Sequence, residues 1–425
     1  MTMREPRISN QQTIKQKNIK LLFKHIQAEP GTTRAQLARK TALSPTTVST
    51  LVDELVQGEL VQETGPANTH SAGRKPITLQ INPQGRQLAL FSLSSWGIHF
   101  ELYNLALEVL DTGFFAHSTA SYQGFAQGAE AADPDVGNDY MAFIQTLLTG
   151  SASYDPARLL AICITYPGIY LEREEAFTST AMQVSLSAAS VIGLEERLNV
   201  PVFLGNSSMC RAYAEKKVLD SPRNSISDLI YMNVCDGLGA GIIAGGVFLK
   251  GREHNAGEVG HVSIDYRGKR CACGLRGCVE QYVNIEAVTQ RVRRALEETS
   301  DHEPLTLEAI GALCLQGNAA VREVVDDVAA MLFTAIYSTV CITGVKRVVI
   351  GGGIEQLGDY FLEKLRSISR ETPRDTLARG IDISYTRAGL NGDSQGIAQF
   401  YLDHVFAICA DDELLQKHAE QAAPA

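Results

Sequence analysis

The sequence predicts an α/β protein with a small, mainly helical domain at its N-terminus. Within residues 1–86, three helical patterns are followed by two strand-like segments, whereas strands and helices alternate through the rest of the chain. The chain has 425 residues, too many for one hydrophobic core, and its hydrophobic content of 45% is that of a globular protein. The alternating part is therefore expected to form two lobes.

Charge is distributed unequally between these two parts. Residues 1–86 hold twelve Lys and Arg against six Asp and Glu, while residues 87–425 hold 26 basic and 42 acidic side chains. The net charge of −10 therefore hides a basic N-terminal domain on an acidic body. This asymmetry indicates that only the N-terminal domain meets a polyanion.

Cysteine usage and the N-terminal residues favour a cytoplasmic protein. Six of the nine cysteines are scattered among apolar neighbours without paired spacing, which is typical of reduced core thiols. The N-terminus is polar and charged, so secretion is not expected. Asn233, Asp236 and several glycines interrupt the apolar run 229–249, so we expect no membrane span and no membrane partner.

The helical patterns of the N-terminal domain, in order, are those of a helix-turn-helix. Apolar residues recur at helical spacing over 11–28, a second short helix is expected over 33–40, and Ser44-Pro45 opens a third. Small hydroxyl side chains gather at the start of this third helix, where they can approach phosphates and base edges as a recognition helix does. These residues are Ser44, Thr46, Thr47, Ser49 and Thr50.

Two strand-like segments follow, at 60–62 and 77–81, and the linker between them has a basic tip that includes Arg74 and Lys75. Such a hairpin is typical of a DNA-binding wing, which could lay Arg74 in the minor groove. The alternative is a three-helix protein-interaction module. The Ser-Pro cap, the hydroxyl face, the basic wing and the local positive charge together favour DNA, so residues 1–86 are predicted to be a winged helix-turn-helix domain.

The body alternates strands and helices in a regular order. Strands are expected at 88–93, 100–105, 109–115, 159–165, 200–204, 229–234, 241–244 and 348–350, and helices at 141–148, from 206 through 215, and at 321–341. Residues 116–137 are expected to form a long loop, and residues 411–425 a polar tail.

Residues 258–280 combine one His, three Cys and two Glu in a Gly-rich loop. Thiolate and imidazole are ligands that suit Zn²⁺, and a closed structural site takes four of them in a tetrahedron. The candidate ligands are His261, Cys271, Cys273 and Cys278. Turns with positive φ are expected at Gly268, Gly274 and Gly277. The alternative is three buried free cysteines beside an unrelated histidine.

On these residues the body resembles the ROK family, whose name joins repressors, open reading frames and sugar kinases. The motifs that carry the resemblance, which covers nearly all of residues 87–405, are Gly257–His261, Cys271–Glu280, Pro167-Gly168 and Val349–Gly353. The resemblance implies an actin/hexokinase-like body with lobes at 87–205 and 206–392, the first completed by a helix at 393–410. A winged helix ahead of such a body is similar to the transcriptional-repressor branch of the family.

Three positions depart from the kinases of that family. Where those kinases carry Asp-x-Gly-Gly-Thr, this chain has Ser92–Trp96, without a glycine in the turn and with a bulky Trp96. Where their second phosphate loop reads Gly-Thr-Gly, this chain has Cys235–Gly237, and the Asp236 carboxylate would repel a phosphate. Where they use an Asn-Asp pair, Ser207 replaces the Asp base, and losing a general base typically costs about 10²–10⁴-fold. We therefore predict no catalytic residue, no bound ATP and no enzyme activity.

The residues that the family uses to hold a sugar match better. Carboxylates accept from adjacent hydroxyls, and an Asn amide can both donate and accept, which suits a vicinal diol. The matching residues are Asn206, Glu258, His261 and Glu280. The kinase Asp also contacts the sugar, so Ser207 in its place leaves open an unusual sugar or a decayed pocket.

The resemblance implies a sugar-responsive transcriptional regulator, a repressor of carbohydrate-utilisation genes with a structural Zn²⁺. It is expected to bind a double-stranded DNA operator as a homodimer or homotetramer. One alternative is an active sugar kinase with a regulatory DNA-binding domain. Another is a constitutive DNA-binding protein whose sugar pocket is vestigial.

Overall fold

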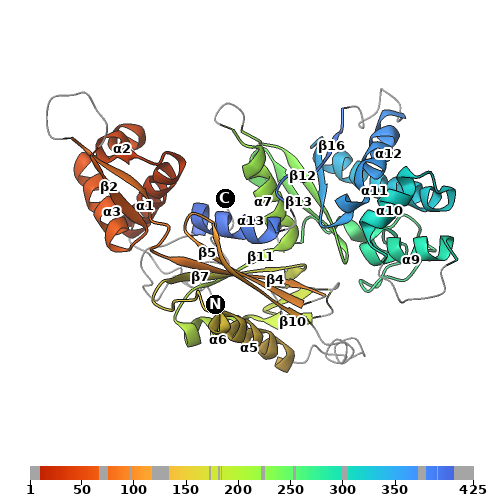
Figure 1. Cartoon of the computed structure of the whole chain (residues 1–425), viewed down its shortest axis with the longest axis horizontal. Coiled ribbons are helices and arrows are strands. Elements are labelled where there is room, and N and C mark those ends of the chain that lie inside the picture. Colours follow the sequence, from red (N-terminus) through yellow and green to blue (C-terminus); the bar gives the residue numbers. More distant parts are fainter. Residues whose placement is uncertain are drawn as a thin grey trace, which may run out of the picture.

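The computed structural model shows three parts along the chain, a small N-terminal domain and two lobes that are each built on a five-stranded sheet (Figure 1). This arrangement confirms the predicted fold class. The residues described are 10–66, 75–95, 97–116, 134–171, 174–179, 182, 184–221, 225–251, 255–297, 305–371, 380–389 and 391–405. Of the predicted features, Arg74, Trp96, most of the 116–137 loop and the tail 411–425 lie outside this part of the chain.

The N-terminal domain has three helices and a small antiparallel sheet of order β1-β3-β2. Its elements are α1 (Asn10–Ala28), β1 (Thr32–Thr33), α2 (Arg34–Thr41), α3 (Pro45–Gln57), β2 (Val61–Pro66) and β3 (Ile77–Ile81). Ser44 caps α3 by accepting a hydrogen bond from the backbone N–H of Thr47, and Pro45 is the first helical residue, as predicted. Strand β2 continues beyond the predicted end at Gln62 because it pairs with β3 as far as Pro66.

The core of the N-terminal domain continues into the body. Apolar residues of α1, α2 and α3 form one buried cluster with residues of the body, which include Leu88, Tyr103, Ala161 and Tyr401. The members from α1 are Ile19, Leu22, Phe23 and Ile26, whereas Ile14, which shares the same helical pattern, is 55% exposed. These side chains pack mainly against α2, α3 and β3 of their own domain, and the contact of α1 with residues 401–405 continues the cluster into the body.

The first lobe is built on a mixed sheet of order β11-β7-β4-β5-β6, in which β11, β7 and β4 run parallel. Its strands are β4 (Gln87–Ser94), β5 (Gly97–Asn104), β6 (Val109–Ala116), β7 (Leu159–Tyr166) and β11 (Val202–Asn206). Helices α5 (Pro134–Gly150) and α6 (Ala188–Leu198) cover one face (Figure 1). A small sheet of order β10-β9-β8 adds β8 (Ile169–Leu171), β9 (Ala176–Ser179) and β10 (Val184–Ser187).

The second lobe is built on a sheet of order β14-β13-β12-β15-β16. Its strands are β12 (Leu229–Val234), β13 (Leu238–Ala244), β14 (Val247–Phe248), β15 (Arg347–Gly351) and β16 (Asp382–Tyr385). Its helices are α8 (Glu280–Val283), α9 (Ile285–Ala295), α10 (Leu307–Leu315), α11 (Ala319–Thr343) and α12 (Gly358–Glu371), with 3₁₀ turns η1 (Val259–His261) and η2 (Ile354–Leu357). Strands β12, β13 and β14 account for the apolar run 229–249 that was predicted not to span a membrane.

Helix α11 is long and apolar enough to cross a membrane by length and composition. Half of its most apolar window is buried within the protein, and its inward residues belong to the core of the second lobe. We therefore interpret α11 as the central helix of a folded lobe.

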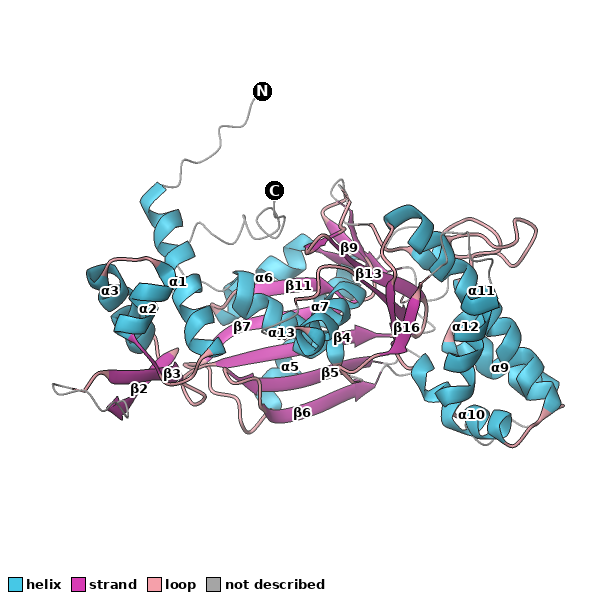
Figure 2. Ribbon diagram, turned by 90° about the horizontal axis from the view of Figure 1, so that it is seen from above, coloured by secondary structure: helices cyan, strands magenta, loops and turns pink. Residues whose placement is uncertain are grey.

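Two helices lie side by side between the lobes, α7 (Ser207–Leu219) and α13 (Gly392–Phe400), and α13 continues into the π-helical turn η3 (Tyr401–Val405) (Figures 1 and 2). Helix α7 packs on β12 and β13 of the second lobe, and α13 packs on β4 and β7 of the first. The two helices touch closely, since a Cβ on Gly396 would come within 1.9 Å of the Cys210 carbonyl oxygen. Any movement between the lobes must therefore involve this helix pair.

Candidate functional site

The loop that carries Glu258 is held directly against strand β13. Gly257 has φ of 103°, and a Cβ there would lie 2.0 Å from the Ala240 carbonyl oxygen. A Cβ on Gly260 would lie 2.3 Å from the carbonyl oxygen of Leu238. Only glycine fits at these two positions, so the Gly-Glu-Val-Gly-His sequence places Glu258 and the following histidine at fixed positions on the sheet.

The four predicted metal ligands come together in one cluster. The ligand atoms of His261, Cys271, Cys273 and Cys278 all lie within 4.8 Å of one another. The Sγ atoms of Cys273 and Cys278 are 3.6 Å apart, and Cys271 Sγ is 3.6 Å from His261 Nδ1. For a tetrahedral Zn²⁺ with Zn–S near 2.3 Å and Zn–N near 2.1 Å, these separations should be about 3.8 Å and 3.6 Å. The cluster therefore fits a metal ion held through Nδ1 of the histidine.

The turns of the cysteine loop follow the prediction at two of the three glycines. Gly274 and Gly277 have positive φ, at 92° and 70°. Gly268 does not, so that part of the prediction is wrong. It is required for space instead, because a Cβ at Gly268 would lie 2.2 Å from the hydroxyl oxygen of Tyr282.

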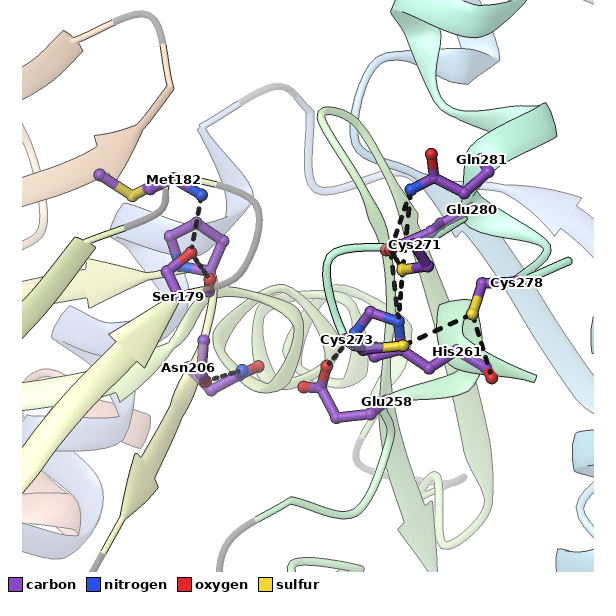
Figure 3. A network of polar contacts seen from close by, with 12 residues as sticks. Ser179, Met182, Asn206, Glu258, His261, Cys271, Cys273, Cys278, Glu280 and Gln281 are labelled. Atoms are coloured by element: carbon purple, nitrogen blue, oxygen red, sulfur yellow. Dashed lines mark hydrogen bonds and ion pairs between the residues drawn. The ribbon is translucent and has the colours of Figure 1, made fainter. Parts of the chain in front are cut away.

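Two carboxylates flank the imidazole of His261 on opposite ring nitrogens (Figure 3). Glu280 Oε1 is 3.2 Å from Nδ1 and 3.0 Å from Cys271 Sγ, while Glu258 Oε2 is 3.8 Å from Nε2. Burial alone would raise the pKa of Glu280, but its hydrogen bonds to His261 and Cys271 outweigh burial and lower that pKa. Burial raises the pKa of Glu258. The bond to Glu280 raises the pKa of His261 to about 9, and a metal ion would compete with that proton for Nδ1.

Asn206 faces this cluster from the first lobe (Figure 3). It ends β11 and caps α7, its Oδ1 accepting from Met209 N at 3.1 Å and its Nδ2 donating to Gly168 O at 2.8 Å. Gly168 is itself pressed against β9, since a Cβ there would lie 2.3 Å from the Thr178 carbonyl oxygen. Burial raises the pKa of neighbouring Tyr166, and the charge of Glu258 adds to that shift. The predicted sugar-holding residues thus meet from two lobes, although their binding role stays a prediction.

The two turns predicted to match the phosphate loops of the family kinases are hydrogen-bonded to each other. Asp236, in the turn between β12 and β13, accepts hydrogen bonds from both the backbone N–H and the hydroxyl of Ser95, in the turn between β4 and β5. The distance from Ser95 N to Asp236 Oδ2 is 3.2 Å. The Asp236 carboxylate therefore accepts the hydrogen bond that the backbone N–H of Ser95 could otherwise donate to a phosphate oxygen.

A buried carboxylate that the sequence analysis did not identify lies behind the first turn. Asp393 of α13 accepts hydrogen bonds from Ser92 Oγ at 2.7 Å and from Thr165 Oγ1 at 3.1 Å, and it pairs with Arg211 of α7 at 3.0 Å. From the resemblance, Ser92 is predicted to match the aspartate of the family kinases. Its acidic partner, Asp393, lies 301 positions further along the chain.

Several hydroxyl groups of the predicted DNA-contacting face are engaged within the N-terminal domain. Ser44 Oγ bonds to Thr47, Thr50 Oγ1 donates to the Thr46 carbonyl oxygen, and Ser49 Oγ accepts from Arg34. Thr46 and Thr50 remain exposed, as does Lys75 before β3. Arg34 is held in turn by Asp53 and Glu63. The DNA contacts of all these residues stay predictions.

Profiles of two known families match the chain. The profile of the ROK family matches residues 138–401, and that of a winged helix-turn-helix DNA-binding domain matches residues 15–62. The two matches account for the body and for the N-terminal domain respectively.

Individual proteins resemble the chain over most of its length. The xylose repressor of Caldicellulosiruptor bescii is 27% identical over 376 residues, 85% of this chain and 89% of that protein. The crystal structure of a ROK family transcriptional regulator, a homologue of the Escherichia coli MLC protein, has 25% identity and a TM-score of 0.72, covering 92% of this chain and 97% of that one. A ROK family glucokinase from Streptomyces griseus, solved with glucose and AMPPNP, shares the fold of the body at 18% identity and a TM-score of 0.59, covering 74% of this chain and 98% of that one.

Proposed function

Because the chain belongs to the ROK family and carries a winged helix-turn-helix domain, we propose that it is a sugar-responsive transcriptional regulator, a cytoplasmic repressor of carbohydrate-utilisation genes. The observation that supports this most strongly is the likeness to a ROK transcriptional regulator over 92% of the chain, which includes the N-terminal domain. Operator DNA would meet the third helix and the wing, and a homodimer would read half-sites spaced by about 34–36 Å.

The proposed sugar site lies between the lobes, formed by Asn206, Glu258, His261 and Glu280. A carboxylate and an amide that face each other can bind adjacent hydroxyls of one ring, which supports a monosaccharide ligand. Zn²⁺ bound by His261 and the three cysteines would supply a rigid support, since four protein ligands leave no open position for water. In this proposal the chain's own residues only bind and orient the sugar.

The structure supports a sensor rather than a kinase at three places. Asp236 is bonded to Ser95 where phosphates would lie, and Ser92 is bonded to Asp393. Ser207, the first residue of α7, is buried and carries no carboxylate that could act as a base. A bound nucleotide would have to break the hydrogen bond between Ser95 and Asp236. Its phosphates would then lie beside the Asp236 carboxylate, which repels them.

The alternative function, an active sugar kinase with a regulatory domain, gives a different result in a coupled ADP-release assay. We expect no ADP release above the sugar-free rate with xylose, glucose or N-acetylated sugars. Turnover in the usual kinase range of about 1–100 s⁻¹ with any of them would establish the kinase and overturn the sensor.

Replacing Glu258 with glutamine should weaken sugar binding about 10- to 100-fold, because hydrogen bonds to charged groups contribute about 1.5–3 kcal/mol. The metal content should not change, since Glu258 is outside the four-ligand cluster. The measurement is a thermal-shift screen of the same sugars, followed by calorimetry with the sugar that stabilises the wild type. Glu308→Gln, at an exposed position on α10, is the matched control. If no sugar stabilises the wild type, the pocket is vestigial and the proposed function fails.

A further inference from the structure

Helix α7 reaches from the proposed sugar site to the opposite end of the helix pair. Asn206 caps its first turn, and its 13 residues span about 20 Å at the usual helical rise. Its first half is tightly enclosed, because a Cβ on Gly241 of β13 would lie 2.3 Å from the Ser208 carbonyl oxygen. Packing this close resists bending, so a displacement at Asn206 moves the helix as a unit.

The last turns of α7 are bonded to one buried carboxylate. Asp403 of η3 accepts from Tyr213 at 2.5 Å and from Lys217 at 2.5 Å, both through Oδ2, while its Oδ1 accepts from Gln399 at 2.9 Å. The side chain of Asp403 is only 2% exposed. Lys217 compensates the charge of this buried carboxylate and the two neutral donors satisfy further lone pairs, so losing Lys217 would leave a buried charge unpaired.

Segment η3 also contacts α1, the first helix of the N-terminal domain. Lys20 of α1 donates to the carbonyl oxygen of His404 at 2.7 Å, across 384 positions of sequence. Tyr401 and Leu402 are buried in the apolar cluster that also contains Ile19 and Phe23 of α1. Segment η3 is therefore in contact with α7 on one side and with α1 on the other. Its π-helical geometry is a form often found at functional positions.

We propose that Asp403 is the positioning residue that couples the sugar site to the DNA-binding domain. It fastens the end of α7 to η3, so that a change in lobe position at Asn206 is passed through η3 to α1. The inference rests on the proposed function and adds to it the contact through which the two sites communicate. The series of contacts is continuous from Asn206 to Lys20, and each step is a hydrogen bond, an ion pair or close packing.

The test measures operator affinity of the full chain with and without the sugar that stabilises it in the screen of xylose, glucose and N-acetylated sugars. The ratio of the two dissociation constants is the coupling factor, typically about 5–150-fold. Asp403→Asn keeps the side-chain volume but removes the charge that Lys217 neutralises. We expect the coupling factor to fall by about 2- to 30-fold, while the sugar still stabilises the variant.

Two further variants separate coupling from general damage. Lys217→Met removes the partner charge from a side chain that is one-third exposed, and it should reduce the coupling factor in the same direction. Lys216→Met is the matched control, because this adjacent lysine pairs with Asp220, the residue that caps the C-terminus of α7, rather than with Asp403 of η3. Its coupling factor should equal that of the wild type.

The results distinguish failure of the Asp403 coupling from failure of the proposed function. Wild-type coupling in both Asp403→Asn and Lys217→Met overturns this inference alone, and so does an equal loss in Lys216→Met. Operator binding by the wild type that no sugar changes overturns the proposed function, and the inference with it.

Discussion

Replacing Cys278 with serine should abolish metal binding and sugar binding together. Cys278 is fully buried, and its Sγ lies 3.6 Å from that of Cys273. A serine hydroxyl stays protonated and is a poor substitute for a thiolate ligand. Structural zinc binds finger peptides with about 10–16 kcal/mol, so its loss would free the cysteine-bearing part of the loop and, with it, Glu280. We expect sugar affinity to fall by more than about 100-fold, since even outer partners of metal ligands contribute about 10–100-fold.

Elemental analysis and calorimetry on the full chain measure both effects. The wild type should contain one zinc per chain, and the variant none. Cys341→Ser is the control, because Cys341 is exposed on α11 and lies outside the ligand cluster. A Cys278→Ser protein that kept its metal, or that lost the metal and still bound sugar with wild-type affinity, would refute the supporting role of this loop.

The features that the sequence predicts correctly are local ones. Ser44-Pro45 specifies the start of α3 because a cap and a first-turn proline act within one helical turn. The four predicted metal ligands lie within 18 residues of each other, with glycines between them, so they come together through a short stretch of chain. Gly268 shows the limit of such reasoning. The sequence predicts a positive φ there, but in the structure its φ is not positive and a Cβ would instead meet the hydroxyl of Tyr282.

The features that the sequence does not reveal join distant residues. Ser92 and Asp393 are 301 positions apart, and Ser95 and Asp236 are 141 apart. Their contacts depend on the order of strands in two sheets and on the helices packed between them. That the Asp236 carboxylate would repel a phosphate stays a prediction, and only the folded chain shows that the backbone N–H and hydroxyl of Ser95 donate hydrogen bonds to it. Asp403 is likewise far in sequence from two of its partners, Tyr213 and Lys217 of α7.

Operator binding should fall steeply with salt and fall again when sugar is added. Counterions released from six to ten phosphates make affinity drop by about 10³–10⁵ between 50 and 200 mM salt. The N-terminal domain has twelve Lys and Arg against six acidic residues, so it carries the positive charge that such phosphate contacts need. Sugar should weaken binding by a further factor of about 5–150, and by reciprocity operator DNA should weaken sugar binding equally. A scrambled duplex of the same length is the control for specificity.

The most direct test of sugar-responsive DNA binding is a fluorescence-anisotropy titration of the full chain. The duplex comes from the chain's own promoter, and the titration is run at two salt concentrations with and without the stabilising sugar. The predicted result is sequence-specific, salt-dependent binding that the sugar weakens. Equal affinity for promoter and scrambled duplexes, or specific binding that no sugar changes, would contradict it.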